Sequence, residues 1–167
     1  MGCQESVMTI DTVHVPSLPV ETPLDARVTR VLDGDTVEAV IALPIGEALP
    51  GTGCCGPVAF VCWRVRLQGI DAPELHPART SPFRDLEKTA AERVKAILAG
   101  RLENQRVVLT LHRWDKFGGR VIGDIIHDHQ DISSWLLELE YVRPYMGDRK
   151  PPWTEEQLNL IIRVPAG

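Results

Sequence analysis

The chain has 167 residues, of which 44% are apolar and 25% charged, and its formal net charge is −5. This length and composition predict one globular domain with a core of its own. The negative charge argues against a broad basic surface for nucleic acids, but it allows a local cationic site beside a bound metal ion. No apolar run reaches the ~18 residues of a membrane span, and no secretory signal precedes the domain. The four cysteines do not form a disulfide framework, so we expect a reducing compartment, the cytoplasm by default.

The start of the chain carries no lasting periodicity. Residues 1–24 contain three prolines and predict a tail or a loosely docked arm, which leaves residues 25–167 as the domain. The opening "MGCQES" matches a myristoylation pattern at Gly2, with Cys3 as a palmitoylation site. Two lipids could hold the protein on a membrane. A disordered start to the chain is the alternative that we favour.

Alternating apolar residues predict three strands in the first half of the domain. "ARVTRVL" (26–32) and "TVEAVIAL" (36–43) flank "DGD" as a hairpin. The Gly- and Pro-rich stretch 44–57 is long for a connection and resembles an insertion. In "VAFVCWRVRLQ" (58–68) Trp63 and Val65 fall on an apolar face, which we assign to the core. Arg66 therefore points away from that face.

The second half predicts three helices and two more strands. "FRDLEKTAAERVKAILAG" (83–100) has helical spacing, a Ser81-Pro82 start and Gly100 in the C′ position. "RVVLTL" (106–111) and "RVIGDII" (120–126) predict strands, and "ISSWLLELE" (132–140) a second helix. "TEEQLNLIIR" begins with a capping box of Thr154 and Gln157. Five short strands interrupted by a helix predict an α+β, mainly β fold: a five-stranded OB-fold barrel with about three packed helices.

Five charged residues lie in loops or at strand ends of this barrel. Each has an ordinary explanation alone, as a turn carboxylate or a solvated cation. Together they indicate chemistry, because the ends of the first and third strands can lie side by side and bring Asp35 near Asp71. Two such carboxylates suit a hard cation such as Ca²⁺. Arg66 and Arg120 supply bidentate donors for phosphate, and Glu74 is left to handle a water. These are the parts that phosphodiester hydrolysis needs.

Three segments resemble the active-site segments of the staphylococcal-nuclease-like (thermonuclease) family. They are "RVLDGDTVEA", "VRLQGIDAPEL" and "DKFGGRVIGDI", in this order, and the resemblance runs from about Arg27 to Tyr145. It implies an OB-fold barrel and a Ca²⁺-dependent nuclease that hydrolyses single-stranded DNA and RNA with little sequence specificity. The products would carry 3′-phosphate ends. No stable protein partner is implied, and we expect a monomer.

The resemblance also implies roles for single residues. The metal ligands would be the carboxylates of Asp35 and Asp71 and the backbone carbonyl of Ala72. Glu74 would be the general base. Arg66 and Arg120 would bind the scissile phosphate and stabilise the phosphorane.

Two further residues match the family's substrate contacts. Lys116 would contact a terminal phosphate, and Tyr145 would offer its ring or hydroxyl to the substrate. Packing under the last helix is an equal alternative for Tyr145. Three departures stand out: Ala72 replaces a threonine, Phe117 replaces a tyrosine, and an additional glycine precedes Arg120.

Other functions remain open at this stage. The same barrel could bind nucleic acid or protein without cleaving it, because a fold does not determine function. A lipid-anchored scaffold would depend on Gly2 and Cys3 alone. The spacing of the histidines and cysteines does not match a zinc site. Trp135, like Trp63, lies on an apolar face and predicts core packing.

Overall fold

The computed structural model describes residues 19–44, 58–116, 118–147 and 150–163. Gly2, Cys3, residues 45–57 of the long loop, and Phe117 lie outside the described residues. The predictions made for them are therefore not addressed by the structure.

A closed barrel of five strands forms the body of the domain, as predicted. The strands run in the order β3-β2-β1-β5-β6, and β3 pairs in parallel with β6 to close the barrel. Their bounds are Val58–Leu67 (β3), Thr36–Pro44 (β2), Pro23–Asp33 (β1), Arg106–Trp114 (β5) and Val121–His127 (β6). The sequence did not predict the three short strands, which are β4 (Ile70–Asp71), β7 (Gln130–Asp131) and β8 (Arg143–Pro144).

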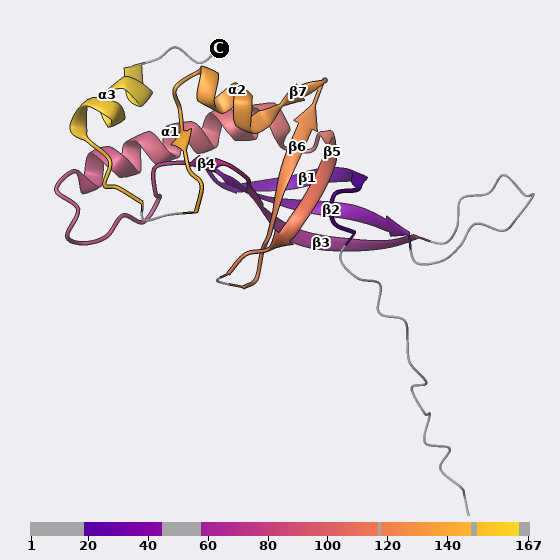
Figure 1. Ribbon diagram of the computed structural model, residues 1–167. Coiled ribbons are helices and arrows are strands. Elements are labelled where there is room, and N and C mark those ends of the chain that lie inside the picture. Colours follow the sequence, from indigo (N-terminus) through magenta and orange to yellow (C-terminus); the bar gives the residue numbers. More distant parts are fainter. Residues whose placement is uncertain (1–18, 45–57, 117, 148–149, 164–167) are drawn as a thin grey trace, which may run out of the picture.

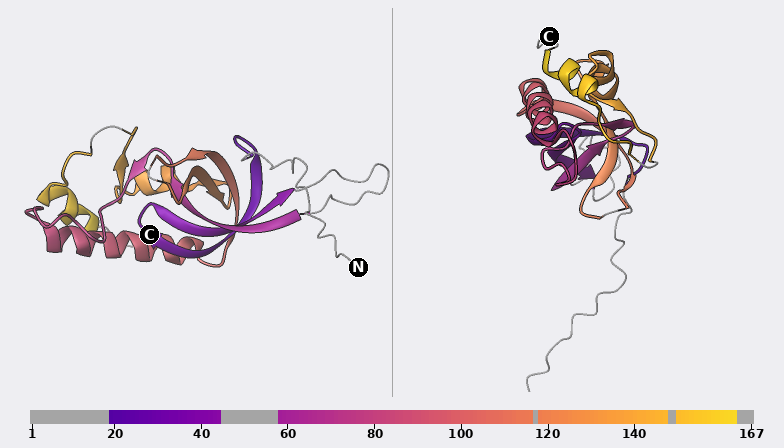
Figure 2. Two further views of the ribbon diagram at one scale, coloured as in Figure 1. Left: turned by 90° about the horizontal axis from the view of Figure 1, so that it is seen from below. Right: turned by 90° about the vertical axis from the view of Figure 1, so that its left-hand side faces the viewer.

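Three helices pack on the outside of the barrel, as the sequence predicts (Figure 1). They are α1 (Arg84–Leu102), α2 (Ile132–Glu138) and α3 (Glu155–Arg163). Helix α1 contacts β1 and α3, whereas α2 contacts β6 and β7. The right-hand view of Figure 2 shows the strands curving around one interior, with α1 and α3 outside it. In the described part of the chain, no helix combines the length and apolarity that a membrane crossing requires.

The ends of the helices test the sequence signals for capping. Thr154 and Gln157 form the predicted capping box, with reciprocal backbone-to-side-chain bonds of 3.1 and 3.3 Å. The prediction that Gly100 ends α1 is wrong, because the helix continues to Leu102, whose side chain is fully buried. Asn104 takes the left-handed conformation (φ 63°) after the helix instead. Burial of Leu102 thus outweighs the local preference of glycine.

The turn between β1 and β2 packs tightly against the rest of the site. A Cβ placed on Gly34 would lie 2.7 Å from the Cβ of Ala72 and 3.0 Å from Cγ1 of Val94. Gly34 is therefore needed for close approach: it lets the turn before Asp35 touch both α1 and the loop after Asp71.

Part of the N-terminal segment is docked on the barrel. Val20 forms a parallel bridge with Leu111, and the Glu21 N–H donates to the Leu111 carbonyl at 2.8 Å. His112 lies between two carboxylates, with Nδ1 2.7 Å from Glu21 Oε1 and Nε2 2.8 Å from Asp124 Oδ2. Residues 19–24, assigned to the tail or arm, thus reach the barrel, and β1 already begins at Pro23.

We expect Gly34→Ala to destabilise the fold by about 1–3 kcal/mol, because the added methyl group overpacks the contact with Ala72 and Val94. Urea denaturation measures the change in unfolding free energy. The matched control is Gly100→Ala, where no atom lies within 4 Å of the added Cβ. That substitution should stabilise the helical residue by about 0.5–1 kcal/mol. Equal effects at the two glycines would contradict the packing argument.

We expect His112 to stabilise the fold in a pH-dependent way. Burial alone would lower the pKa of His112, but the hydrogen bonds and charges of Glu21 and Asp124 outweigh it and raise the pKa above 6.5. The folded state therefore binds the proton more tightly than the unfolded state. The stabilisation is complete below the unfolded pKa and is lost as the pH rises through the folded pKa.

The variant His112→Gln should therefore lose more unfolding free energy at about pH 6 than at about pH 9. Denaturation series at several pH values measure this difference. His129→Gln, at an exposed position in the β6–β7 turn, is the matched control and should follow the wild-type profile. A pH-independent effect of His112→Gln would refute the ion-pair explanation.

Candidate active site

A buried ion pair joins the turn before β2 to the end of β3. Arg66 pairs with Thr36 in the ladder, and the Leu67 N–H donates to the Asp35 carbonyl at 2.8 Å. This register places the Arg66 guanidinium against the Asp35 carboxylate, to which Nη1 donates. Both residues are buried, with 9% and 6% exposure. The strand thus brings a cation and a carboxylate together below the surface.

Asp71 is the second carboxylate beside this guanidinium. Arg66 Nη2 donates to the Ile70 carbonyl at 3.2 Å and lies 3.9 Å from Asp71 Oδ1. The β4–β8 pairing sets Asp71 opposite Arg143, whose Nε and Nη2 donate to Asp71 Oδ2 at 3.0 and 2.7 Å. Asp71 is only 1% exposed. The structure therefore brings Asp35, Arg66 and Asp71 together and adds Arg143.

A lysine bridges Asp71 and Glu74. Lys150 Nζ lies 2.5 Å from Asp71 Oδ1 and 2.8 Å from Glu74 Oε1. Glu74 keeps half of its side chain exposed. Its loop is tied to α1 by Glu87, a buried carboxylate that accepts from Ser81 Oγ at 3.2 Å and from the Glu74 N–H at 3.5 Å. Glu74 is thus a solvent-facing carboxylate on an anchored loop.

Arg120 is the last residue of the β5–β6 turn. The Asp115 N–H donates to the Arg120 carbonyl at 3.0 Å, and Arg120 Nε donates to the buried Asp115 carboxylate. Gly118 and Gly119 both have φ of 72°, a left-handed conformation that suits glycine. The turn therefore accommodates its additional glycine, and Arg120 lines the same cleft as Arg66.

The charged residues surround one cleft of about 960 Å³. Five residues expected in the site line it, and they are Arg66, Glu74, Lys116, Arg120 and Tyr145. The Tyr145 ring centroid lies 5.9 Å from Arg66 Cζ and 5.7 Å from Lys150 Nζ, a cation–π arrangement. Tyr145 therefore forms part of the wall of the cleft. With Arg113 and Lys150 included, five cationic side chains and two carboxylates line the described cleft.

The carboxylates keep two cations of the site, the buried Arg66 and the more exposed Lys150, charged. Burial alone would lower the pKa of Arg66, but Asp35, Asp71 and Glu74 outweigh it and raise the pKa. Burial likewise opposes the charge of Lys150, and Asp71 and Glu74 raise its pKa. Both side chains therefore remain cationic at neutral pH.

Asp33 precedes Asp35 by two residues, and its surroundings disfavour its charged form. Burial raises its pKa from 3.8 to about 6, the Gly34 N–H opposes this shift, and the charges of Asp35 and Glu74 add to it. The Asp33 carboxylate lies in a second hollow of about 410 Å³, which it shares with His76 and Arg120.

The implied calcium site can be tested against the donors present. Among the described residues, no three carboxylate, imidazole or thiol side chains gather closely enough to hold a metal ion by themselves. However, the Lys150 ammonium lies between two carboxylate oxygens, 2.5 Å from the buried Asp71 Oδ1 and 2.8 Å from Glu74 Oε1. This ammonium acts as a stand-in cation between two hard oxygen donors. Asp71 and Glu74 thus offer two oxygen donors of the kind that a hard cation prefers, and a cation bound there would have to displace Lys150.

The sequence did not single out four residues of this site: Arg113, Trp114, Arg143 and Lys150. Arg143 lies in the two-residue strand β8 and Lys150 in the loop before α3, and both segments are too short or irregular for a periodicity that predicts which way a side chain points. Their cationic character near Tyr145 was the only available signal.

Asp35 and Asp71 lie beneath the cleft and do not line it. Ala72, in the loop that follows Asp71, is buried against Gly34 of the β1–β2 turn.

Comparison with models of known protein families and with curated proteins found no match to this chain.

We expect Lys150→Met to strengthen calcium binding by about tenfold or more, because it removes a positive charge that competes with the ion for Asp71. Isothermal titration of the protein with CaCl₂ measures the affinity directly. Lys88→Met is the matched control, since Lys88 pairs with Glu92 on the exposed face of α1. Unchanged or weaker calcium binding in Lys150→Met would show that the ammonium does not hold the cation position.

Proposed function

We propose that the protein is a Ca²⁺-dependent nuclease of the staphylococcal-nuclease-like type. It hydrolyses phosphodiester bonds of single-stranded DNA and RNA with little sequence specificity and leaves 3′-phosphate ends. The observation that carries the proposal is the single cleft that Arg66, Arg120 and Glu74 share, with Asp35 and Asp71 directly beneath Arg66. Few binding sites need two guanidinium groups, an exposed carboxylate and a buried carboxylate pair at once.

The two arginines bind the phosphate in this proposal. Arg66 is fixed by Asp35 and the Ile70 carbonyl, and Arg120 by Asp115. These bonds use two of the five N–H donors of Arg66 and one of those of Arg120. The remaining donors can bind phosphate oxygens and stabilise the charge that develops on them as water attacks. Because both side chains are already oriented, little reorganisation is needed at the moment of reaction.

Glu74 serves as the base. Its half-exposed carboxylate accepts a proton from the attacking water, whose oxygen forms the new bond to phosphorus. The bond between phosphorus and the 5′-oxygen breaks, the leaving 5′-oxygen takes up a proton from solvent to become a hydroxyl, and the phosphate stays on the 3′ side. Anchoring of the Glu74 loop by Glu87 holds the base in place beside the cleft.

A calcium ion would be held by the carboxylates of Asp35 and Asp71 and by the Ala72 carbonyl. When bound, it would neutralise charge on the phosphate and make the nearby water more acidic. Lys150 and Arg143 neutralise Asp71 in the protein as described.

A second candidate function is a non-catalytic OB-fold module that binds nucleic acid. The position of Lys150 favours it, because an ammonium already balances Asp71 and Glu74 without a metal ion. The cationic cleft would then hold phosphates without cleaving them.

Cleavage of labelled single-stranded DNA and RNA in Ca²⁺ and in EGTA tests the proposal. We expect cutting in Ca²⁺ only. Glu74→Gln should lower the rate by about a hundredfold or more, since it removes the base and keeps the shape. Arg120→Lys should also lower it by about a hundredfold, because lysine lacks the bidentate fork.

Glu92→Gln is the matched control for Glu74→Gln, because Glu92 is an exposed carboxylate on α1 outside the cleft. It should keep the wild-type rate. Intact substrate in Ca²⁺ with the folded protein would reject the nuclease and favour the binding module. Full activity of Glu74→Gln would reject the proposed base.

A further inference from the structure

Trp114 exposes a large apolar surface inside the cationic cleft. It is the last residue of β5, and 53% of it is exposed. It lines the same cleft as Arg66 and Arg120. A tryptophan that serves only the core buries most of its area, so this exposure calls for another explanation.

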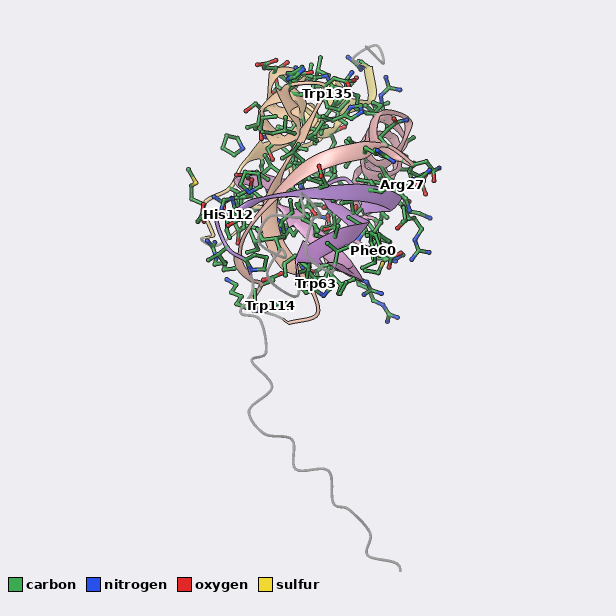
Figure 3. The ribbon with its side chains drawn as sticks, turned by 90° about the vertical axis from the view of Figure 1, so that its right-hand side faces the viewer. Arg27, Phe60, Trp63, His112, Trp114 and Trp135 are labelled. Carbon is green, nitrogen blue, oxygen red and sulfur yellow. The ribbon has the colours of Figure 1, made fainter. Side chains whose placement is uncertain are left out.

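A second tryptophan holds Trp114 in place. The centroids of Trp63 and Trp114 lie 5.5 Å apart with an interplanar angle of 66°, an edge-to-face arrangement. Trp63 comes from β3 and packs against the hydrophobic core. Figure 3 shows the two rings close together at one margin of the barrel. The contact with Trp63 thus fixes the orientation of the exposed indole, so a ligand that stacks on it meets a preorganised surface.

The charges around Trp114 select the class of ligand. Its neighbour Arg113 lines the cleft, as does Lys116 in the adjacent turn. The chain as a whole carries a net charge of −5, so this concentration of cations is local. An apolar protein partner would gain little from such charges, whereas a polyanion with aromatic groups matches both features.

We propose that Trp114 is a stacking platform for an unpaired base, placed beside the phosphate that Arg66 and Arg120 bind. This inference depends on the proposed function for the location of the phosphate. It adds the reason for a preference for single strands: in a duplex the faces of the bases are already stacked and cannot lie on an indole. Because every base has such a face, the platform tolerates any sequence.

Binding in EGTA tests the platform without cleavage. The probes are a short oligothymidylate and an oligonucleotide of equal length made of abasic nucleotides, and fluorescence anisotropy gives the dissociation constants. We expect Trp114→Ala to weaken binding of oligothymidylate by about five- to a hundredfold, the range for loss of one stacked base. Binding of the abasic strand should not change. Trp114→Phe should keep most of the affinity, which also guards against a folding defect in the alanine variant.

Phe60→Ala is the matched control, since Phe60 is an aromatic residue of β3 with 72% exposure and does not line the cleft. It should bind both strands as the wild type does. Equal losses on both probes, or no loss on either, in Trp114→Ala would overturn the proposal. The protein could bind oligothymidylate more tightly than the abasic strand only when Trp114 is present, and yet never cleave. That result would support the platform and reject the nuclease, so the two failures are distinguishable.

Discussion

The site depends on one buried guanidinium. Arg66 is 9% exposed and lies against Asp35, Asp71 and the Ile70 carbonyl, so it connects the turn before β2, the end of β3 and β4. Removing it would leave the buried Asp35 carboxylate without its cation, which commonly costs several kcal/mol. Stability and the proposed phosphate binding therefore depend on the same side chain.

The C-terminal segment completes the charge balance that Arg66 begins. Arg143 bonds to Asp71 and to the Pro151 carbonyl at 2.6 Å, and its guanidinium lies 4.1 Å from the Trp153 ring centroid. Trp153 is itself buried. Packing of this tryptophan thus holds the Arg143 guanidinium beside Asp71, so the segment after α2 contributes a cation to the candidate site.

The sequence predicted those parts of the molecule that local rules determine. Alternation in β3 gave the face of Arg66, but not its burial, which comes from β4 and from residues far along the chain. The resemblance supplied the roles of Asp71 and Glu74 as a hypothesis only. Lys150 could not be foreseen, because its place between two carboxylates is an electrostatic outcome of the folded chain and leaves no periodic trace. The prediction that the helix ends at Gly100 was wrong, because burial of Leu102 outweighs the preference of glycine for a helix end.

Charge balance also sets what the cleft can accept. Near Asp71, the carboxylates of Asp35, Asp71 and Glu74 are matched by Arg66, Arg143 and Lys150. An arriving phosphate adds negative charge to a group of residues that is already neutral. Its compensation must come from the outer cations of the cleft, or from a divalent ion that displaces Lys150 and frees it to face the phosphate. A chain of net charge −5 thereby concentrates its attraction for a polyanion at one place, where the proposed chemistry occurs.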